Sequence, residues 1–159
     1  MQIELIEKKL EELREITKRI TLKDKHHSPM FFPIVHEKII YPSTFSFFEQ
    51  GEKEATQAML RKTLKDMKEI EAYIFICETY FVTKNSDEDC LISCSRPSMS
   101  PDRQEAILIN YSARDGTKRL IFLPFKRTEC GQIFFDEEQE MLTEKEIILG
   151  EFSNLFEAT

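Results

Sequence analysis

Residues 105–125, EAILINYSARDGTKRLIFLPF, contain two runs of β-prone residues on either side of Asp115-Gly116. This arrangement is a strong short-range signal for a β-hairpin, because glycine readily takes the positive φ that a tight turn requires. With a two-residue turn at this position, Tyr111 would face Leu120 on the neighbouring strand. The stretch therefore predicts an antiparallel strand pair as the centre of the fold.

Three further segments have the composition of strands. Residues 72–82 are apolar at both alternating sets of positions, which predicts a strand that is covered on both faces. Residues 29–41 are rich in β-branched and aromatic side chains. They contain Pro29 and Pro33, which lack an N–H donor, so this strand should lie at a sheet edge or carry an irregularity. Residues 132–135 predict a short last strand.

Three segments predict helices. Residues 2–21 place apolar side chains at three- and four-residue steps, which gives one narrow stripe. The stripe consists of Ile3, Ile6, Leu10, Leu13, Ile16 and Ile20. It is compatible with a helix that packs on its own domain and with the seam of a homodimer. Residues 51–69 predict a second helix. Its apolar positions are Ala55, Met59, Leu60, Leu64 and Met67. A capping-box pattern at 143–146 precedes a third helix, predicted at 144–157.

The predicted order of elements is α-β-α-β-β-β-α. We expect an α+β fold with a mostly antiparallel four-strand sheet and helices packed on it. The helix between the first two strands permits one parallel pair. The length of 159 residues, without an internal repeat or a linker, predicts a single domain over residues 1–159.

The composition limits the classes of function. A net charge of -7 would repel phosphate backbones, which argues against a nucleic-acid partner. Only four glycines occur, so a glycine-rich phosphate cradle is not expected, and we expect no cofactor. The first residues lack the apolar segment of a signal peptide, and no run approaches about 18 apolar residues. These features predict a cytoplasmic protein that does not enter a membrane.

The histidines and cysteines are the candidate ligands for a transition metal. His26-His27 are adjacent, and side chains of adjacent strand residues point to opposite faces. Cys90 and Cys94 are close enough to chelate, and Cys77 with Cys130 could complete a four-thiolate zinc site. Against this, no CxxC occurs, and Cys77 lies in an apolar strand where free cysteine is often simply buried. We therefore expect no metal and four reduced thiols.

Glu78 is the ionisable carboxylate within the apolar segment 72–82. A carboxylate on a covered strand requires a cation or a hydrogen-bond donor, or its pKa rises. Such groups are enriched at functional sites. The alternative is a structural ion pair with a cation on a neighbouring strand, for instance Arg119 or Arg103.

Two polar segments allow similar alternatives. The loop at 95–103, SRPSMSPDR, carries two arginines whose forked guanidinium groups suit a carboxylate or phosphate. Its serines and aspartate would equally well anchor the loop to the backbone. The acidic segment 136–140 lacks the glycine and the alternating ligands of a calcium loop, so it predicts a solvated turn.

Short motifs resemble a set of small uncharacterised bacterial proteins. The resemblance rests on Cys77-Glu-Thr-Tyr80, Arg96-Pro-Ser98, Pro101-Asp-Arg103 and Glu105, followed by the hairpin. Proteins of that set carry a strand ending in Ser-Glu-Ala-Trp, and this chain lacks the tryptophan. The resemblance spans residues 30–127 and implies a bacterial, cytosolic protein. It draws attention to Glu78, Asp102 and Arg103 and implies no mechanism.

Three functions agree with these features. The first is a small protein-binding or regulatory module that works through protein contact, with a homodimer formed through residues 2–21. The second is a hydrolase-like enzyme that uses Glu78 with Asp102 and Arg103. The third is an accessory protein of a phage or mobile element. A cleft between Glu78 and Arg103 would favour the enzyme, and an exposed apolar patch on the first helix would favour binding.

The thiol assignment is testable. All four cysteines are expected to react with a thiol reagent in denaturant without prior reduction, because reduced thiols are the rule in the cytosol. The native protein is expected to contain no stoichiometric zinc. A finding of about one zinc per chain, or of fewer than four reactive thiols, would contradict the assignment.

Overall fold

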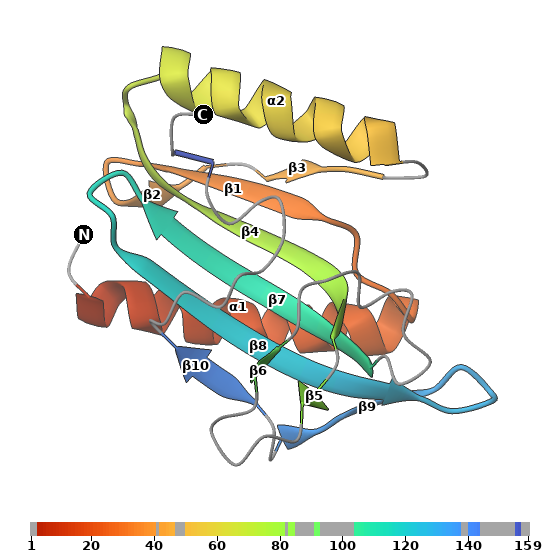
Figure 1. The fold of residues 1–159 in the computed structure, drawn as a ribbon. Coiled ribbons are helices and arrows are strands. Elements are labelled where there is room, and N and C mark those ends of the chain that lie inside the picture. The colour runs from red at the N-terminus through yellow and green to blue at the C-terminus, as the bar shows by residue number, and fades with distance from the viewer. Residues whose placement is uncertain are drawn as a thin grey trace.

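The computed structural model describes residues 3–40, 42–46, 50–81, 83–84, 91–92, 104–137, 140–143 and 155–156. Within these ranges the chain forms two helices and a large antiparallel sheet (Figure 1), which confirms the α+β class. The helices are α1, Ile3–Asp24, and α2, Gln50–Asp66. The strands are β1 Met30–Val35, β2 Lys38–Ile39, β3 Ser43–Thr44, β4 Ile70–Phe81, β5 Thr83–Lys84, β6 Leu91–Ile92, β7 Gln104–Ala113, β8 Lys118–Arg127, β9 Ile133–Phe135 and β10 Met141–Thr143.

In the described part of the chain, the main sheet has eight strands rather than the four expected. Six follow the order β10-β8-β7-β4-β1-β2, while β3 pairs with β1 and β9 pairs with β8. Strands β5 and β6 form a separate pair. The additional strands are two or three residues long. One of them, β9, corresponds to the short last strand predicted at 132–135, whereas β2, β3 and β10 carry too little periodicity to predict.

The pair β1–β4 is antiparallel, so the parallel pair that the intervening helix permitted does not form. Strand β3 brings the chain back to the beginning of β1, where Thr44 lies beside Met30. Helix α2, about 25 Å long at 1.5 Å per residue, then carries the chain to the other end of β1. Strand β4 begins there, with Ile70 beside Val35, and runs back along β1.

Strand β4 is covered on both faces, as predicted. Its residue Ile74 belongs to a core cluster that includes Leu10 of α1. The next residue back, Tyr73, belongs to a second cluster that includes Leu64 of α2. Figure 1 shows the corresponding layers, with α1 along one face of the sheet and α2 along the other. Both alternating sets are apolar because each faces a helix.

The buried faces of the helices differ from the predicted stripes. Helix α1 lies on its own sheet, and its buried residues are Ile6, Leu10, Thr17 and Thr21. Two members of the predicted stripe, Ile3 and Ile16, are 52% and 46% exposed. In α2 only Leu60 and Leu64 of the predicted face are buried, whereas Met59 and Met67 are exposed. Threonine enters the buried face of α1 because the Thr21 hydroxyl donates to the Thr17 carbonyl, which satisfies it.

The hairpin between β7 and β8 forms, but its register differs by one residue from the prediction. Tyr111 lies opposite Arg119 rather than Leu120. The reason is a three-residue loop, closed by Ala113 N donating to the Thr117 carbonyl. Gly116 has a φ of 95°, which confirms the predicted positive φ. A shift of one residue exchanges the two faces of β8, so Arg119 faces α1.

Pro33 occupies a position that tolerates its missing donor. Its carbonyl accepts from Ile40 N on the side of β1 away from β4. The absent N–H points to the same side, where β2 and β3 cover only the ends of β1. The register also shifts between Ile34 and Val35, so the predicted irregularity is present.

The end of the chain departs from the prediction where the structure describes it. Leu155 and Phe156, within the predicted last helix, form a turn. The rest of that helix, including the carboxylate of the capping box, lies outside the described residues. Glu140, expected in a solvated turn, is only 6% exposed at its side chain and pairs with Arg14 and Lys18 of α1.

The turn predicts the effect of substitution at Gly116. An added Cβ would meet no atom within 4 Å, so any loss comes from backbone strain alone. Gly116→Val should lower the free energy of unfolding by about 1–2 kcal/mol, because a β-branched residue disfavours this φ. Gly116→Asn should lose less, since asparagine tolerates the left-handed region. Thermal melting measures both, and equal melting temperatures for the valine variant and the parent would contradict the argument.

Candidate functional site

Glu78 lies on the α1 face of β4, in its carboxyl-terminal half. Its Oε1 accepts from His27 N at 2.6 Å, and its Oε2 lies 3.6 Å from an Nη atom of Arg127. Its side chain is 27% exposed. An ion pair with a strand cation therefore forms, but the partner is Arg127 of β8 rather than Arg119. The other suggested partner, Arg103, lies outside the described residues.

Arg127 is the centre of a charged cluster that joins three elements. Its Nε donates to both carboxylate oxygens of Glu105 on β7, at 3.0 and 3.2 Å. Its Nη1 donates to the Lys25 carbonyl just after α1 at 2.5 Å. The guanidinium also lies over the ring of Phe125. These contacts attach the end of α1 to the sheet, which is a structural role.

The cluster is short of positive charge. Burial raises the pKa of Glu78, and the nearby Glu105 adds to this effect, while the His27 amide and Arg127 act in the opposite direction. Burial also lowers the pKa of His27, which keeps that ring neutral at pH 7. One arginine therefore serves two carboxylates, and the ionised form of Glu78 is disfavoured in the folded protein.

Several other residues singled out in the sequence cannot be placed relative to this cluster. Asp102 and Arg103, with the whole 95–103 loop, lie outside the described residues. Cys77 has a pKa raised to about 11 by burial, so its thiol stays protonated at neutral pH. Cys90 and Cys94 are also outside the described ranges. In the part of the chain that is described, no three His, Cys, Asp or Glu side chains gather closely enough to hold a metal ion.

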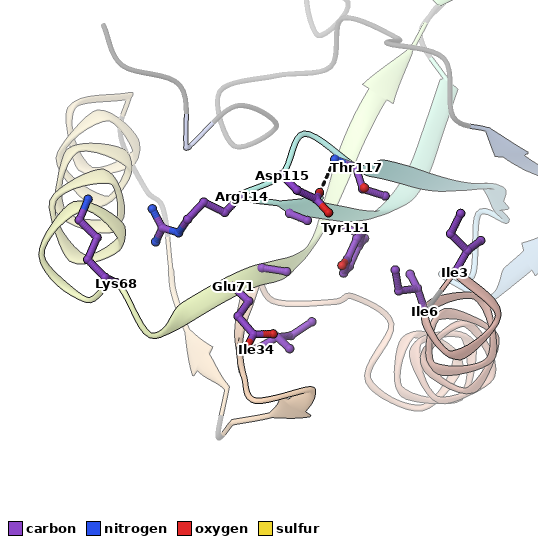
Figure 2. A pocket seen from close by; sticks show the side chains of 11 residues that line it. Ile3, Ile6, Ile34, Lys68, Glu71, Tyr111, Arg114, Asp115 and Thr117 are labelled. Carbon is purple, nitrogen blue, oxygen red and sulfur yellow. Dashed lines mark hydrogen bonds between the residues drawn. The ribbon is translucent and has the colours of Figure 1, made fainter. Parts of the chain in front are cut away.

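A cavity of about 270 Å³ lies at the other end of the sheet. Figure 2 shows it between the beginning of α1, the strands β1 and β4, and the turn of the β7–β8 hairpin. Apolar side chains, among them Ile6 and Ile34, line one part. The carboxylates of Glu71 and Asp115 line another part. The cavity is distinct from the Glu78 cluster, because Glu71 and Glu78 stand at opposite ends of β4.

Tyr111 is the central side chain of this cavity. It is 3% exposed, and burial raises its pKa to about 12, with contributions from the nearby Asp115 and Glu71. Its neighbour across the hairpin, Arg119, donates to the Lys118 carbonyl and approaches Glu7 of α1 at 4.0 Å. Within the described residues no hydrogen bond involves the Tyr111 hydroxyl. The phenol is therefore a neutral group that is available to a ligand.

The two carboxylates of the cavity are held by backbone donors. Asp115 accepts from Thr117 N at 2.8 Å, as Figure 2 shows. Glu71 on β4 accepts from His36 N at 3.2 Å. His36 lies in the turn between β1 and β2, where both His36 and Glu37 have positive φ. These bonds fix the positions of both carboxylates without neutralising their charge.

Arg114 also lines the cavity but is engaged elsewhere. Its guanidinium donates to the carbonyls of Leu64 and Ile70, each at 2.9 Å, and lies 4.7 Å from the ring of Phe156. Figure 2 shows its side chain directed away from Tyr111. Arg114 therefore anchors α2 to the hairpin.

Sequence reasoning missed this cavity. From the sequence, Asp115 is a turn residue and Tyr111 a strand residue, and no pattern marks Glu71. The available signal was one aromatic hydroxyl close to a hairpin turn on an otherwise apolar strand. The surroundings of the Tyr111 hydroxyl depend on the register of the hairpin. The predicted register placed Leu120 beside Tyr111, whereas the structure places Arg119 there.

Comparison with known proteins identifies a family. The model of the family described as bacteriophage lambda protein ea47 matches residues 1–153. No curated protein and no solved structure matches the chain. Among the described residues, no helix is long and apolar enough to cross a membrane.

The Glu78 cluster predicts an unusual response to charge removal. Because its folded pKa is raised, ionised Glu78 disfavours folding, and this effect grows as the pH rises above the ordinary value of 4.5. Glu78→Gln keeps an acceptor for His27 N and removes the charge. It should be as stable as the parent near pH 4 and up to about 1 kcal/mol more stable at pH 7, a small gain because solvent screens the group.

Chemical denaturation at several pH values measures the difference. Glu105→Gln is the matched control, because it removes the carboxylate that holds Arg127 through two contacts, and it should be destabilising at pH 7. If Glu78→Gln lost more stability than Glu105→Gln at pH 7, the assignment of Glu105 as the main partner of Arg127 would be wrong.

Proposed function

The chain belongs to the bacteriophage lambda protein ea47 family, and we propose that it is a phage or mobile-element accessory protein that works through protein contact. The contact surface is the outer face of α1, and its first partner is a second copy of the same chain. The family match supports the phage origin. The exposed apolar residues of α1 support the contact surface.

The observation that carries this proposal is the position of Leu5 and Ile16. They are 36% and 46% exposed, on a helix whose other face already packs on the sheet. They are eleven residues apart, which is close to three helical turns, so they lie on one line along the helix. Two large apolar side chains aligned outside the core are a natural contact for a partner.

The charge of α1 favours a second copy of this helix in the opposite direction. Its first half, residues 3–13, has four acidic and two basic side chains, while its second half, residues 14–24, has four basic and two acidic ones. An antiparallel pair would therefore place each acidic half beside a basic half. Contact of Leu5 in one copy with Ile16 in the other would place the two-fold axis beside residues 10 and 11, and the acidic and basic halves would then overlap only in part.

The interface would be small. Four apolar side chains at about 1.5–3 kcal/mol each only partly exceed the entropy lost on association. We therefore expect a dimer that dissociates on dilution.

The hydrolase-like alternative has less support. Glu78, its proposed catalytic residue, is engaged by the His27 amide and lies beside Arg127, in a cluster that attaches α1 to the sheet. We place the protein in the bacterial cytoplasm, in keeping with its net charge of -7.

Light scattering of the full chain at high micromolar concentration tests the dimer. The parent should have twice the mass of one chain, and the double variant Leu5→Glu with Ile16→Glu should be monomeric, because four buried carboxylates would replace the apolar contact. Met59→Glu is the matched control, since Met59 is an exposed apolar residue on α2 and should leave the dimer intact. A monomeric parent, or a dimer that survives the double substitution, would contradict the proposal.

A further inference from the structure

The cavity beside the β7–β8 turn carries charges of both signs at separate positions. Its volume of about 270 Å³ is near the lower end for ligand pockets, which suits a compact molecule. Figure 2 shows the charged ends of Lys68 and Arg114 on the α2 side of the cavity. The carboxylates of Glu71 and Asp115 lie nearer the middle, and α1 bounds the opposite side. A molecule that spans the cavity therefore meets cations, then carboxylates, and then an apolar wall.

The cationic side has donors that the described residues leave unused. Lys68 is exposed, and within the described ranges it forms no ion pair with a carboxylate. Arg114 donates to the carbonyls of Ile70 and Leu64 through Nε and Nη2, and no hydrogen bond to a described residue involves its Nη1. Because a carbonyl carries no net charge, these bonds leave the positive charge of the guanidinium in place. This side suits a carboxylate, which accepts charge-assisted bonds from ammonium and guanidinium groups.

The carboxylates in the middle lack a lysine or arginine partner in the described part of the chain. The ion partner of Glu71 is the ring of His36, at 3.8 Å and 84% exposed. Asp115 accepts from Thr117, whose bonds lower the pKa of this carboxylate most, and the N-terminal ammonium adds a smaller effect in the same direction. Glu71 is therefore the main position for a cationic group of a ligand, and Asp115 is the second.

The apolar wall is formed by α1 and continues onto the sheet. Ile6 and Ile34 are 3% and 1% exposed and belong to one core cluster. Ile3 lines the same cavity and is 52% exposed, so an apolar body placed there would remove it from water. An apolar lining with a few fixed polar groups is the usual composition of a small-molecule site.

We propose that this cavity binds a free α-amino acid with an apolar side chain. Its carboxylate lies towards Lys68 and Arg114, its ammonium group lies beside Glu71, and its side chain lies against Ile3 and Ile6. In an α-amino acid the ammonium is carried on the carbon between the carboxylate and the side chain, which is the order of the matching groups in the cavity. This site is separate from the outer face of α1 that serves the proposed dimer.

L-Leucine is a suitable probe, because two counterparts each lack one of its charges. 3-Methylbutylamine lacks the carboxylate, and 4-methylpentanoate lacks the ammonium group. Titration of the full-length protein at pH 7, followed by amide chemical shifts in ¹H–¹⁵N spectra and by calorimetry, should give binding roughly tenfold tighter for leucine than for either counterpart, since each lost charge-assisted bond costs about that factor or more. The shifts should concentrate at residues 34, 68–72 and 111–117.

Four variants assign each charge of leucine to its partner. Lys68→Gln should weaken leucine binding roughly threefold or more and leave 3-methylbutylamine unaffected, because that amine has no carboxylate. Glu71→Gln should weaken leucine by a similar factor, leave 4-methylpentanoate no weaker, and still accept from His36 N. Lys65→Gln and Glu69→Gln change exposed charges outside the cavity lining and should bind leucine like the parent. All four positions are exposed, so each variant should melt like the parent.

The proposal is overturned if 3-methylbutylamine or 4-methylpentanoate binds as tightly as leucine, or if leucine at millimolar concentration does not bind. It is also overturned if the shifts lie elsewhere, if Lys68→Gln behaves like Lys65→Gln, or if Glu71→Gln behaves like Glu69→Gln.

Discussion

The fold depends on the burial of strand β4 from both sides. Tyr73 and Ile74 are neighbours in sequence, and they are 0% and 1% exposed although they point to opposite faces. Neither face can be left to water, so α1 must cover one and α2 the other. Both candidate sites lie beside α1, one towards each end of β4. Lys25, just after α1, takes part in the first, and Ile3 and Ile6 of α1 line the second.

The central hairpin and the two-sided strand were predictable, because long apolar runs carry a clear periodicity. The register was not. It depends on whether the loop contains two residues or three, and Asp115-Gly116 is compatible with both. One residue of difference exchanged the faces of β8. This placed Arg119, rather than Leu120, beside Tyr111.

The candidate sites were predictable to a smaller extent. Glu78 stood out because it is a carboxylate in an apolar strand, and its need for a partner was foreseen. The identity of its partner, Arg127, was not predictable, because the meeting of the two side chains depends on the register of β4, β7 and β8. Glu71 and Asp115 are adjacent to turns, where acidic residues are common, so nothing in the sequence distinguishes them.

The ion pair between Arg14 and Glu140 joins residues that are 126 positions apart. During synthesis α1 is made well before Glu140, the carboxylate that pairs with Arg14 and Lys18 of this helix. At about 5–20 residues per second, the interval is roughly 6–25 s. During this interval α1 lacks the ion pairs with Glu140 that attach it to the segment before β10. In a nascent chain this helix is therefore exposed to other proteins, including other nascent copies, before all its contacts with its own sheet can form.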